Sequence, residues 1–106
     1  MNDKYYVYMI RCEDNSLYTG IALDVEKRYL LHKSGKGAKY TRNKKVKKLE
    51  ISFLCENKSE ALKVESYIKK KNKPWKELVI TDVSLLEMKI FEELKIKIKK
   101  ILTHNR

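Results

Sequence analysis

The sequence contains little proline and glycine, with one Pro and three Gly among 106 residues. Disordered chains are usually rich in these residues, so most of this chain is expected to fold. Its longest apolar runs, such as residues 5–10, are far shorter than a membrane-spanning helix. The N-terminus also lacks the basic and then apolar layout of a signal peptide. We therefore expect no membrane segment and predict a cytoplasmic protein.

Cysteine is also scarce. Cys12 and Cys55 are the only two, and they lie in strand-like runs without C-x-x-C spacing. Such residues are most simply reduced thiols within the fold. Since the two histidines are far apart in the sequence, a zinc site is not expected. The length fits one small domain, which can bury roughly two thirds of its unfolded surface.

Positive charge is abundant. Lys and Arg number 25 against 14 acidic residues, which gives a formal net charge of +11. This charge steers a small domain toward polyanions, among which nucleic acid is the leading candidate. Residues 35–48, GKGAKYTRNKKVKK, are rich in cations and contain no acidic residue. Tyr40 and Thr41 stand among the cations and can hydrogen-bond or stack, so this segment suits phosphate contact; the alternative is solvated charge.

The order of local signals predicts an α+β fold. Stretches rich in aromatic and branched side chains predict strands, and the turn chemistry of residues 13–16 should join the first two as a hairpin. We expect a small three-stranded antiparallel sheet flanked by helices, with an extra helix at the C-terminus. Strands are predicted at residues 4–12, 17–21 and 49–54, and helices at residues 25–34, 60–71, 75–79 and 84–102.

Capping residues support these helix boundaries. Asp24 is a good N-cap for the first helix, which Gly35 should end. Ser59 is the expected N-cap of the second helix. Ser84 and Glu87 have the spacing of a capping box at the start of the last one.

The last predicted helix has one broad apolar face. That face should pack on its own domain or against the same helix of another chain. Glu as well as Lys on the polar side argues against a membrane surface. The face consists of Leu86, Ile90, Phe91, Leu94, Ile98, Ile101 and Leu102.

One carboxylate interrupts an apolar helix face. Ala61, Leu62 and Ile68 should face the sheet, and Glu65 lies among them. A carboxylate there is costly to bury unless it is paired or bound to a cation. The alternatives are a rim position that reaches water and a salt bridge to one of many lysines. Asn72 continues the same line.

The first predicted helix and the hairpin hold further polar side chains. Arg28 and His32 are four residues apart and share a helix face, which makes them candidate functional residues. The alternative is that they are an ordinary pair on the protein surface. Tyr8 and Tyr18 share a face of the hairpin if its loop has three or five residues, although they could also be ordinary core residues. Gly20 leaves that face open beside Tyr18.

These residues and their spacing resemble those of the GIY-YIG nuclease superfamily. YVY at 6–8 stands where the family has GIY, YTG at 18–20 stands where it has YIG, and ALKVE at 61–65 matches the helix that ends in the family's metal-binding Glu. The small stand-alone bacterial members have similar LYTGI, DVEKR and GKGAKYTR segments. The matching positions, in order, are Tyr8, Tyr18, Arg28, His32 and Glu65.

The resemblance implies a divalent-metal-dependent endonuclease. Glu65 would hold one Mg²⁺ or Mn²⁺ ion, with water and phosphate oxygens as its other ligands. Tyr18 would activate the attacking water; a phenol, with an ordinary pKa of about 10, needs a nearby cation or metal for this. Tyr8 or His32 would assist or relay the proton. Arg28 would bind the phosphate and offset developing charge.

The resemblance also implies a nucleic-acid partner, DNA first and RNA as the alternative, with a role in DNA repair or processing. A nucleic-acid-binding module with weak or no catalysis is the second interpretation, and a partner-binding domain that uses the C-terminal helix is the third. The segment expected to follow the phosphate backbone includes Lys36, Lys39, Tyr40, Thr41, Arg42, Lys44 and Lys45.

The sequence also departs from the family's pattern. Tyr6 replaces the Gly of GIY, Ile21 or a neighbour replaces a Lys that some members have after YIG, and His32 replaces a frequent Tyr. Asn72 corresponds loosely to a late family Asn.

We expect residues 1–80 to form the nuclease-like domain and residues 81–106 to form a C-terminal amphipathic helix, in a monomer or in a homodimer through that helix. The separate DNA-recognition domains of larger members have no counterpart, so we do not expect strong sequence selectivity.

Overall fold

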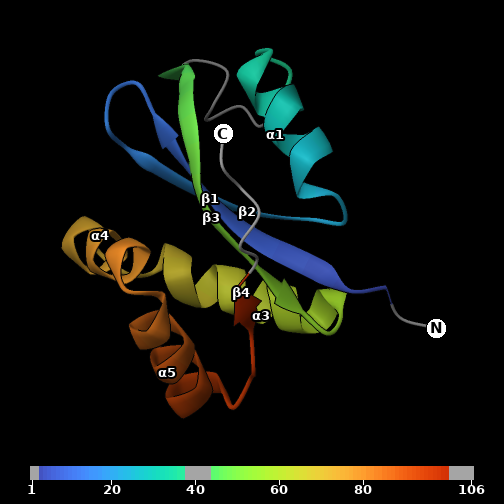
Figure 1. The fold of residues 1–106 in the computed structure, drawn as a ribbon, viewed down its shortest axis with the longest axis vertical. Coiled ribbons are helices and arrows are strands. Elements are labelled where there is room, and N and C mark those ends of the chain that lie inside the picture. The colour runs from blue at the N-terminus through green and yellow to red at the C-terminus, as the bar shows by residue number, and fades with distance from the viewer. Residues whose placement is uncertain (1–2, 38–43, 101–106) are drawn as a thin grey trace.

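The computed structural model describes residues 3–37 and 44–100, which form a four-stranded antiparallel sheet with four helices. The strand order is β2-β1-β3-β4, so β2 is an edge strand (Figure 1). The strands are β1 (Tyr5–Cys12), β2 (Leu17–Ala22), β3 (Val46–Cys55) and β4 (Lys99–Lys100). The helices are α1 (Val25–Lys33), α3 (Lys58–Lys69), α4 (Lys73–Thr81) and α5 (Val83–Leu94).

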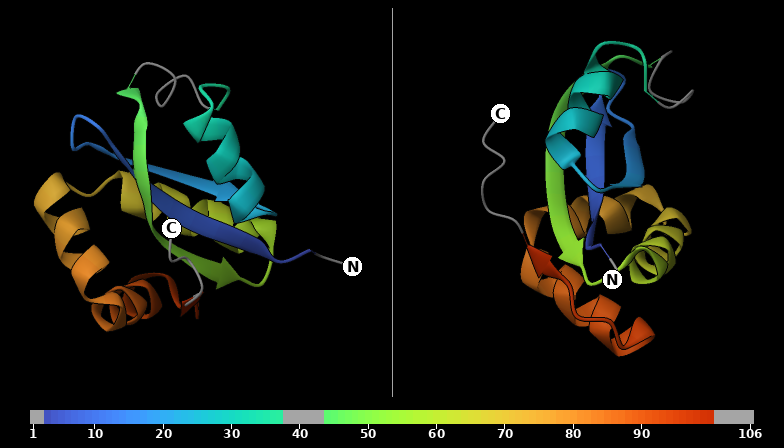
Figure 2. Two further views of the ribbon diagram at one scale, coloured as in Figure 1. Left: turned by 45° about the horizontal axis from the view of Figure 1, so that its top comes forward. Right: turned by 90° about the vertical axis from the view of Figure 1, so that its right-hand side faces the viewer.

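Helices cover both faces of the sheet. Helix α1 lies on one face, and α3, α4 and α5 lie on the other (Figures 1 and 2). Alternation along β1 sends Val7 and Met9 into the larger core under α3–α5, while Tyr8 and Ile10 enter the smaller core under α1. All four side chains are fully buried. The α+β class predicted from the sequence is therefore confirmed.

The sheet has one strand more than predicted. Residues 99–100 pair with Phe53 and Leu54 of β3 as the short strand β4. The predicted helix to residue 102 is wrong in extent, because α5 ends at Leu94 and Lys95 adopts a left-handed conformation with φ of 59°. Strand β3 is also longer than predicted, since it already begins at Val46.

Helix caps follow the predicted chemistry, although two cap residues differ. Asp24 caps α1 as expected, and Gly35 follows the helix with φ of +84°. The N-cap of α3 is Asn57, whose side chain accepts from the Glu60 N–H, rather than Ser59. In α5 the N-cap is Asp82 rather than Ser84. In each of these two cases an Asn or Asp shortly before the predicted Ser supplies the capping oxygen.

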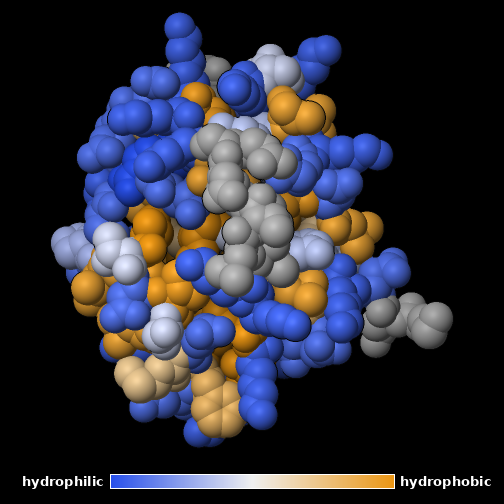
Figure 3. Space-filling view, in the orientation of Figure 1, coloured by the Kyte–Doolittle hydropathy of each residue, from blue (hydrophilic) through white to orange (hydrophobic). Residues whose placement is uncertain are grey.

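The N-terminal part of α5 packs in the larger core, because Leu86 and Ile90 are fully buried there. Its outer side leaves Met88 and Phe91 about half exposed. The face shown in Figure 3 is hydrophilic over most of its extent, and its apolar side chains gather mainly in the half that holds α4 and α5. A homodimer through this side of α5 stays a prediction. Ile101 and Leu102 of the predicted helix face lie outside the described residues.

Cys12 and Cys55 are unpaired and fully buried, as their setting in strands predicts. Burial raises the pKa of the Cys55 thiol to about 12 and that of Cys12 in the same direction. Neither thiol is therefore an accessible nucleophile at neutral pH. Within residues 3–37 and 44–100, no helix is long and apolar enough to cross a membrane.

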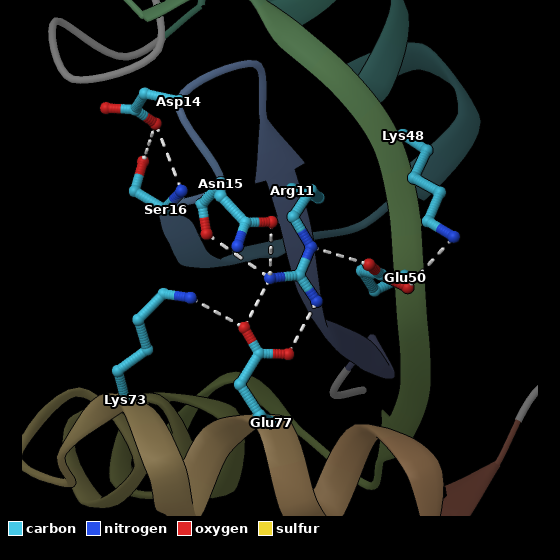
Figure 4. A network of polar contacts seen from close by, with 8 residues as sticks. All are labelled: Arg11, Asp14, Asn15, Ser16, Lys48, Glu50, Lys73 and Glu77. Carbon is cyan, nitrogen blue, oxygen red and sulfur yellow. Dashed lines mark hydrogen bonds and ion pairs between the residues drawn. The ribbon is translucent and has the colours of Figure 1, made fainter.

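An ion network fastens α4 to the sheet (Figure 4). Arg11 of β1 donates from Nε to Glu50 of β3 at 2.8 Å. Its two terminal nitrogens contact both carboxylate oxygens of Glu77 on α4, at 2.7 Å from Nη2 to Oε1. Lys73 is 2.8 Å from the same carboxylate. Because Arg11 is on the α3–α5 face of β1, this network lies across the sheet from Tyr8.

The network predicts a pH dependence of stability. Hydrogen bonds from Arg11 and Lys73 lower the pKa of Glu77 to about 2, from an ordinary value near 4.5. A lowered folded-state pKa adds stability above the unfolded value, and this stability is lost as the pH falls toward 2. The melting temperature of Glu77→Gln should therefore fall less steeply than that of the wild type between about pH 4.5 and 2. Thermal melts by circular dichroism across this range measure the two melting temperatures. Parallel curves of melting temperature against pH would contradict the prediction.

Candidate active site

The hairpin register places Tyr8 and Tyr18 on one face of the sheet. Tyr8 is opposite Gly20, and Ile10 is opposite Tyr18. Arg11 pairs with Leu17, so the loop has five residues, 12–16, which is one of the two lengths expected. A Cβ on Gly20 would lie 2.6 Å from the Tyr8 hydroxyl oxygen and 3.0 Å from Cε2 of Tyr18. Glycine at this position therefore lets both phenol rings lie over β2.

His32 joins the two tyrosines from α1. Its side chain is buried, and its Nε2 lies 2.8 Å from the Tyr8 hydroxyl oxygen. The ring centroids are 5.1 Å apart for Tyr18 and His32, 5.8 Å for Tyr8 and His32, and 6.3 Å for the two tyrosines. The three rings form one cluster, so His32 is an internal partner of Tyr8 rather than a surface residue.

Burial keeps the Tyr8–His32 pair neutral. Burial raises the pKa of Tyr8 above its ordinary value, and the negative charges of Tyr18 and Glu65 add to this effect. Arg28 opposes it through its charge and a side-chain hydrogen bond. Burial first, and then the charge of Arg28, lower the pKa of His32. Tyr8 is thus a protonated phenol at neutral pH and His32 a neutral imidazole, and one hydrogen bond joins them.

A second glycine makes room for His32. A Cβ on Gly37 would lie 2.3 Å from Nδ1 of His32 and 2.8 Å from its Cα. No side-chain atom tolerates such an approach, and part of the clash is with backbone. The two glycines, one in β2 and one after α1, therefore make space for Tyr8 and for His32 respectively.

Gly37→Ala should therefore displace His32 and weaken its bond to Tyr8. We expect a changed chemical shift for the His32 ring protons and a stability loss of roughly 1–3 kcal/mol, in the range of other overpacked sites. Two-dimensional NMR and urea melts measure both quantities. Gly35→Ala is the control, because a Cβ there meets no atom within 4 Å and only its φ of +84° is strained. Unmoved His32 signals in the Gly37 variant would contradict this packing.

Arg28 and Glu65 bring opposite charges to the tyrosine cluster. Arg28 is exposed on α1, and its guanidinium acts on both Tyr8 and His32. Glu65 comes from α3, on the opposite side of the sheet, and its charge acts on the Tyr8 phenol. Its side chain is only 17% exposed and pairs with Lys69 at 3.3 Å. Since β2 is an edge strand, α3 can place side chains beside Tyr18; the Lys69 ammonium lies 6.0 Å from its ring centroid.

The donor set at Glu65 fits a sparsely coordinated divalent cation. Among the described residues, no group of three His, Cys, Asp or Glu side chains could hold a metal ion. A cation held by Glu65 would therefore take most of its ligands from water and phosphate, as Mg²⁺ commonly does. The partly buried carboxylate already has a cationic neighbour in the Lys69 ammonium group, so the position suits positive charge.

The basic segment is only partly within the described residues. Lys39, Tyr40, Thr41 and Arg42 lie outside them. Lys36 and Lys45 are exposed. Lys44 forms an ion pair with Asp14 at 2.6 Å, so this lysine is engaged within the protein. Contact between this segment and nucleic acid remains a prediction.

Asn72 has a structural task. Its side chain caps α4 and accepts from the Trp75 N–H at 3.0 Å. The sequence pattern does not distinguish two other residues near the cluster. Gly37 belongs to the basic segment, and Lys69 is one of many lysines. For Lys69, its position four residues after Glu65 was the available signal.

Comparison with known proteins gives the family of this chain. A family model for the GIY-YIG catalytic domain matches residues 4–78. The chain belongs to the GIY-YIG family, which confirms the resemblance predicted from the motifs.

Its relatives include small bacterial proteins named UPF0213. The chain is 53% identical over 97 residues to one from Fusobacterium nucleatum, covering 92% of this chain and 97% of that protein. It is 38% identical over 98 residues to the UPF0213 protein YsiG of Lactococcus lactis, covering 92% and 94%. A solution NMR structure of a UPF0213 protein from Bacillus halodurans is 38% identical, with a TM-score of 0.48 over 74% of this chain and 83% of that chain.

Proposed function

We propose that the protein is a divalent-metal-dependent DNA endonuclease with Tyr8, Tyr18, Arg28, His32 and Glu65 as its active site. The observation that carries this proposal is the cluster of the Tyr8, Tyr18 and His32 rings, whose centroids lie 5.1 to 6.3 Å apart. The charges of Arg28 and Glu65 both act on Tyr8. A formal net charge of +11 supports a polyanionic substrate.

The two tyrosines differ in burial and in their neighbours, and so have different roles. Tyr8 is buried, and its raised pKa makes it a poor base. Tyr18 is partly exposed, so water can reach it, and the Lys69 ammonium group lies 6.0 Å from its ring centroid. Tyr18 is thus the better group to accept a proton from an attacking water. Tyr8 and His32 orient Tyr18 and can pass the proton onward through their own hydrogen bond.

Arg28 supplies the phosphate contact. Its guanidinium is exposed while its charge reaches the tyrosine cluster, so it can bind a phosphate oxygen and stabilise the charge that develops during cleavage. Glu65 would hold the Mg²⁺ or Mn²⁺ ion. When bound, such an ion polarises the phosphate and stabilises the leaving oxygen. The lysines of the basic segment would bind the adjoining backbone and make binding salt-dependent.

Replacing Tyr18 by phenylalanine tests this proposal. The variant keeps the ring and loses the hydroxyl, so we expect the cleavage rate to fall by roughly a hundredfold while DNA binding persists. Nicking of supercoiled plasmid and cleavage of branched and single-stranded DNA, with Mg²⁺ or Mn²⁺, measure the rate. Tyr67→Phe is the matched control, since Tyr67 is on α3 and its ring packs edge-on against Trp75. Equal cleavage by the Tyr18 variant and the wild type would contradict the assignment.

The second candidate function is nucleic-acid binding without catalysis, which the net charge alone would support. It predicts salt-sensitive binding of DNA or RNA, with no metal-dependent cleavage of any substrate in the panel. The same assay, run with and without EDTA and followed by a salt titration of binding, separates the two functions. A role in DNA repair or processing is part of the first proposal.

A further inference from the structure

Lys69 is placed between two groups of the proposed active site. Its ammonium nitrogen lies 3.3 Å from Oε2 of Glu65 and 6.0 Å from the ring centroid of Tyr18. Half of its side chain is exposed, whereas that of Glu65 is mostly covered. The ammonium group therefore lies beside the carboxylate assigned to the metal and beside the phenol assigned as the base, with access to solvent.

A helix pair four residues apart can be a simple surface contact, which stabilises a helix by only about 0.3–0.5 kcal/mol. Two observations go beyond that. The Glu65 carboxylate is mostly buried at the site rather than on an open helix surface. The lysine also approaches an aromatic ring from a different element, because Tyr18 is on β2. Lys69 thus belongs to the site by contact as well as by spacing.

The charge of Lys69 also acts on a second lysine. The charge of Lys69 helps to lower the pKa of Lys76 on α4, after the larger effect of burial. Two neighbouring ammonium groups repel each other, and an anion placed between or beside them removes that repulsion. The half-exposed ammonium group of Lys69, which lies next to Glu65 and Tyr18, therefore has the charge and the access to solvent that a phosphate contact needs.

We propose that Lys69 neutralises Glu65 in the metal-free protein and that a divalent cation displaces it when the metal ion binds Glu65. This exchange leaves the ammonium group of Lys69 to bind a phosphate of the nucleic acid. This inference rests on the proposed function, because it needs a metal ion at Glu65 and a nucleic acid across Tyr18. It adds a phosphate-binding residue on α3, across the site from Arg28 on α1. A phosphodiester could thus be held from both helices.

The first half of this proposal is that a metal ion displaces Lys69 from Glu65. Direct Mn²⁺ binding, read from the electron paramagnetic resonance signal of free Mn²⁺ without any DNA, tests it. Lys69→Met removes the competing charge, so it should bind Mn²⁺ roughly threefold to tenfold more tightly than the wild type. Glu65→Gln should abolish binding at this site. Lys63→Met is the matched control, since Lys63 is an exposed lysine on the other side of the same helix and should leave the affinity unchanged.

Binding of a labelled DNA duplex, measured by fluorescence anisotropy with Ca²⁺ in place of Mg²⁺, tests the second half. Lys69→Met should weaken binding and reduce the slope of log affinity against log salt concentration by about one. Tighter metal binding together with weaker DNA binding is the combined result expected from this one substitution. A purely structural role for Lys69 would not raise metal affinity.

The outcomes separate this inference from the proposed function. If Glu65→Gln abolishes Mn²⁺ binding but Lys69→Met leaves it unchanged, the exchange is wrong and the nuclease site stands. If Lys69→Met tightens Mn²⁺ binding without weakening DNA binding, the phosphate contact is wrong. If the wild type binds no Mn²⁺ through Glu65, both the inference and the proposed metal site are wrong.

Discussion

Glu65→Gln is expected to lower the rate of metal-dependent DNA cleavage by roughly a hundredfold to a thousandfold. Glutamine keeps the size of the side chain and removes the charge that would hold a divalent cation. The fold should survive, because the pair with Lys69 contributes only about 0.5 kcal/mol to the helix. Plasmid nicking at a saturating Mn²⁺ concentration, with the folded fraction checked by circular dichroism, measures the loss.

The control for this substitution is Glu92→Gln. Glu92 is exposed on α5, so the variant makes the same change of charge away from the tyrosine cluster. We expect it to cleave DNA at the wild-type rate. If Glu65→Gln retains more than about a third of wild-type activity, the assignment of the metal site to Glu65 is wrong. Equal losses in the two variants would contradict a specific role for Glu65.

Arg11→Met should produce the largest loss of stability, about 3 kcal/mol. The side chains of Arg11 and Glu50 are each only 11% exposed, so methionine leaves the carboxylates of Glu50 and Glu77 close together without their shared cation. For a domain of this size the melting temperature should fall by roughly 12 °C. Thermal and urea unfolding followed by circular dichroism measure the change.

A second variant separates uncompensated charge from lost packing. Arg11→Met combined with Glu50→Met and Glu77→Met should regain most of the lost stability, because no buried charge remains without its partner. Lys73 and Lys48, which also contact these carboxylates, are about half exposed and stay solvated. Cleavage per folded molecule should be unchanged in both variants, since the network is across the sheet from Tyr8. No recovery in the triple variant would show that the stability loss comes from packing.

Much of the candidate site was predictable because it follows from local periodicity. Alternation along the hairpin gave the shared face of Tyr8 and Tyr18, and helical spacing gave that of Arg28 and His32. Glu65 stood out as a carboxylate on an apolar helix face. The structure adds contacts between these separate elements, such as the bond from Tyr8 to His32, which lies 24 residues away.

The features that could not be predicted depend on long-range contacts, or on backbone conformations that leave no strong local signal in the sequence. Arg11 meets Glu77 across 66 residues, and no spacing rule connects them. Helix α5 ends at a lysine in the left-handed region, where a glycine is the usual sign, so its apolar pattern suggested a longer helix. The two-residue strand β4 is too short to show alternation in the sequence.

The central claim is that Tyr8, Tyr18, Arg28, His32 and Glu65 form one metal and phosphate site. Anomalous scattering from crystals grown with Mn²⁺ and a short DNA duplex tests it most directly. We expect a manganese peak roughly 2.1 Å from a carboxylate oxygen of Glu65, with a DNA phosphate between this ion and Arg28. A manganese ion bound elsewhere, with DNA on another face and the Glu65–Lys69 pair intact, would contradict it.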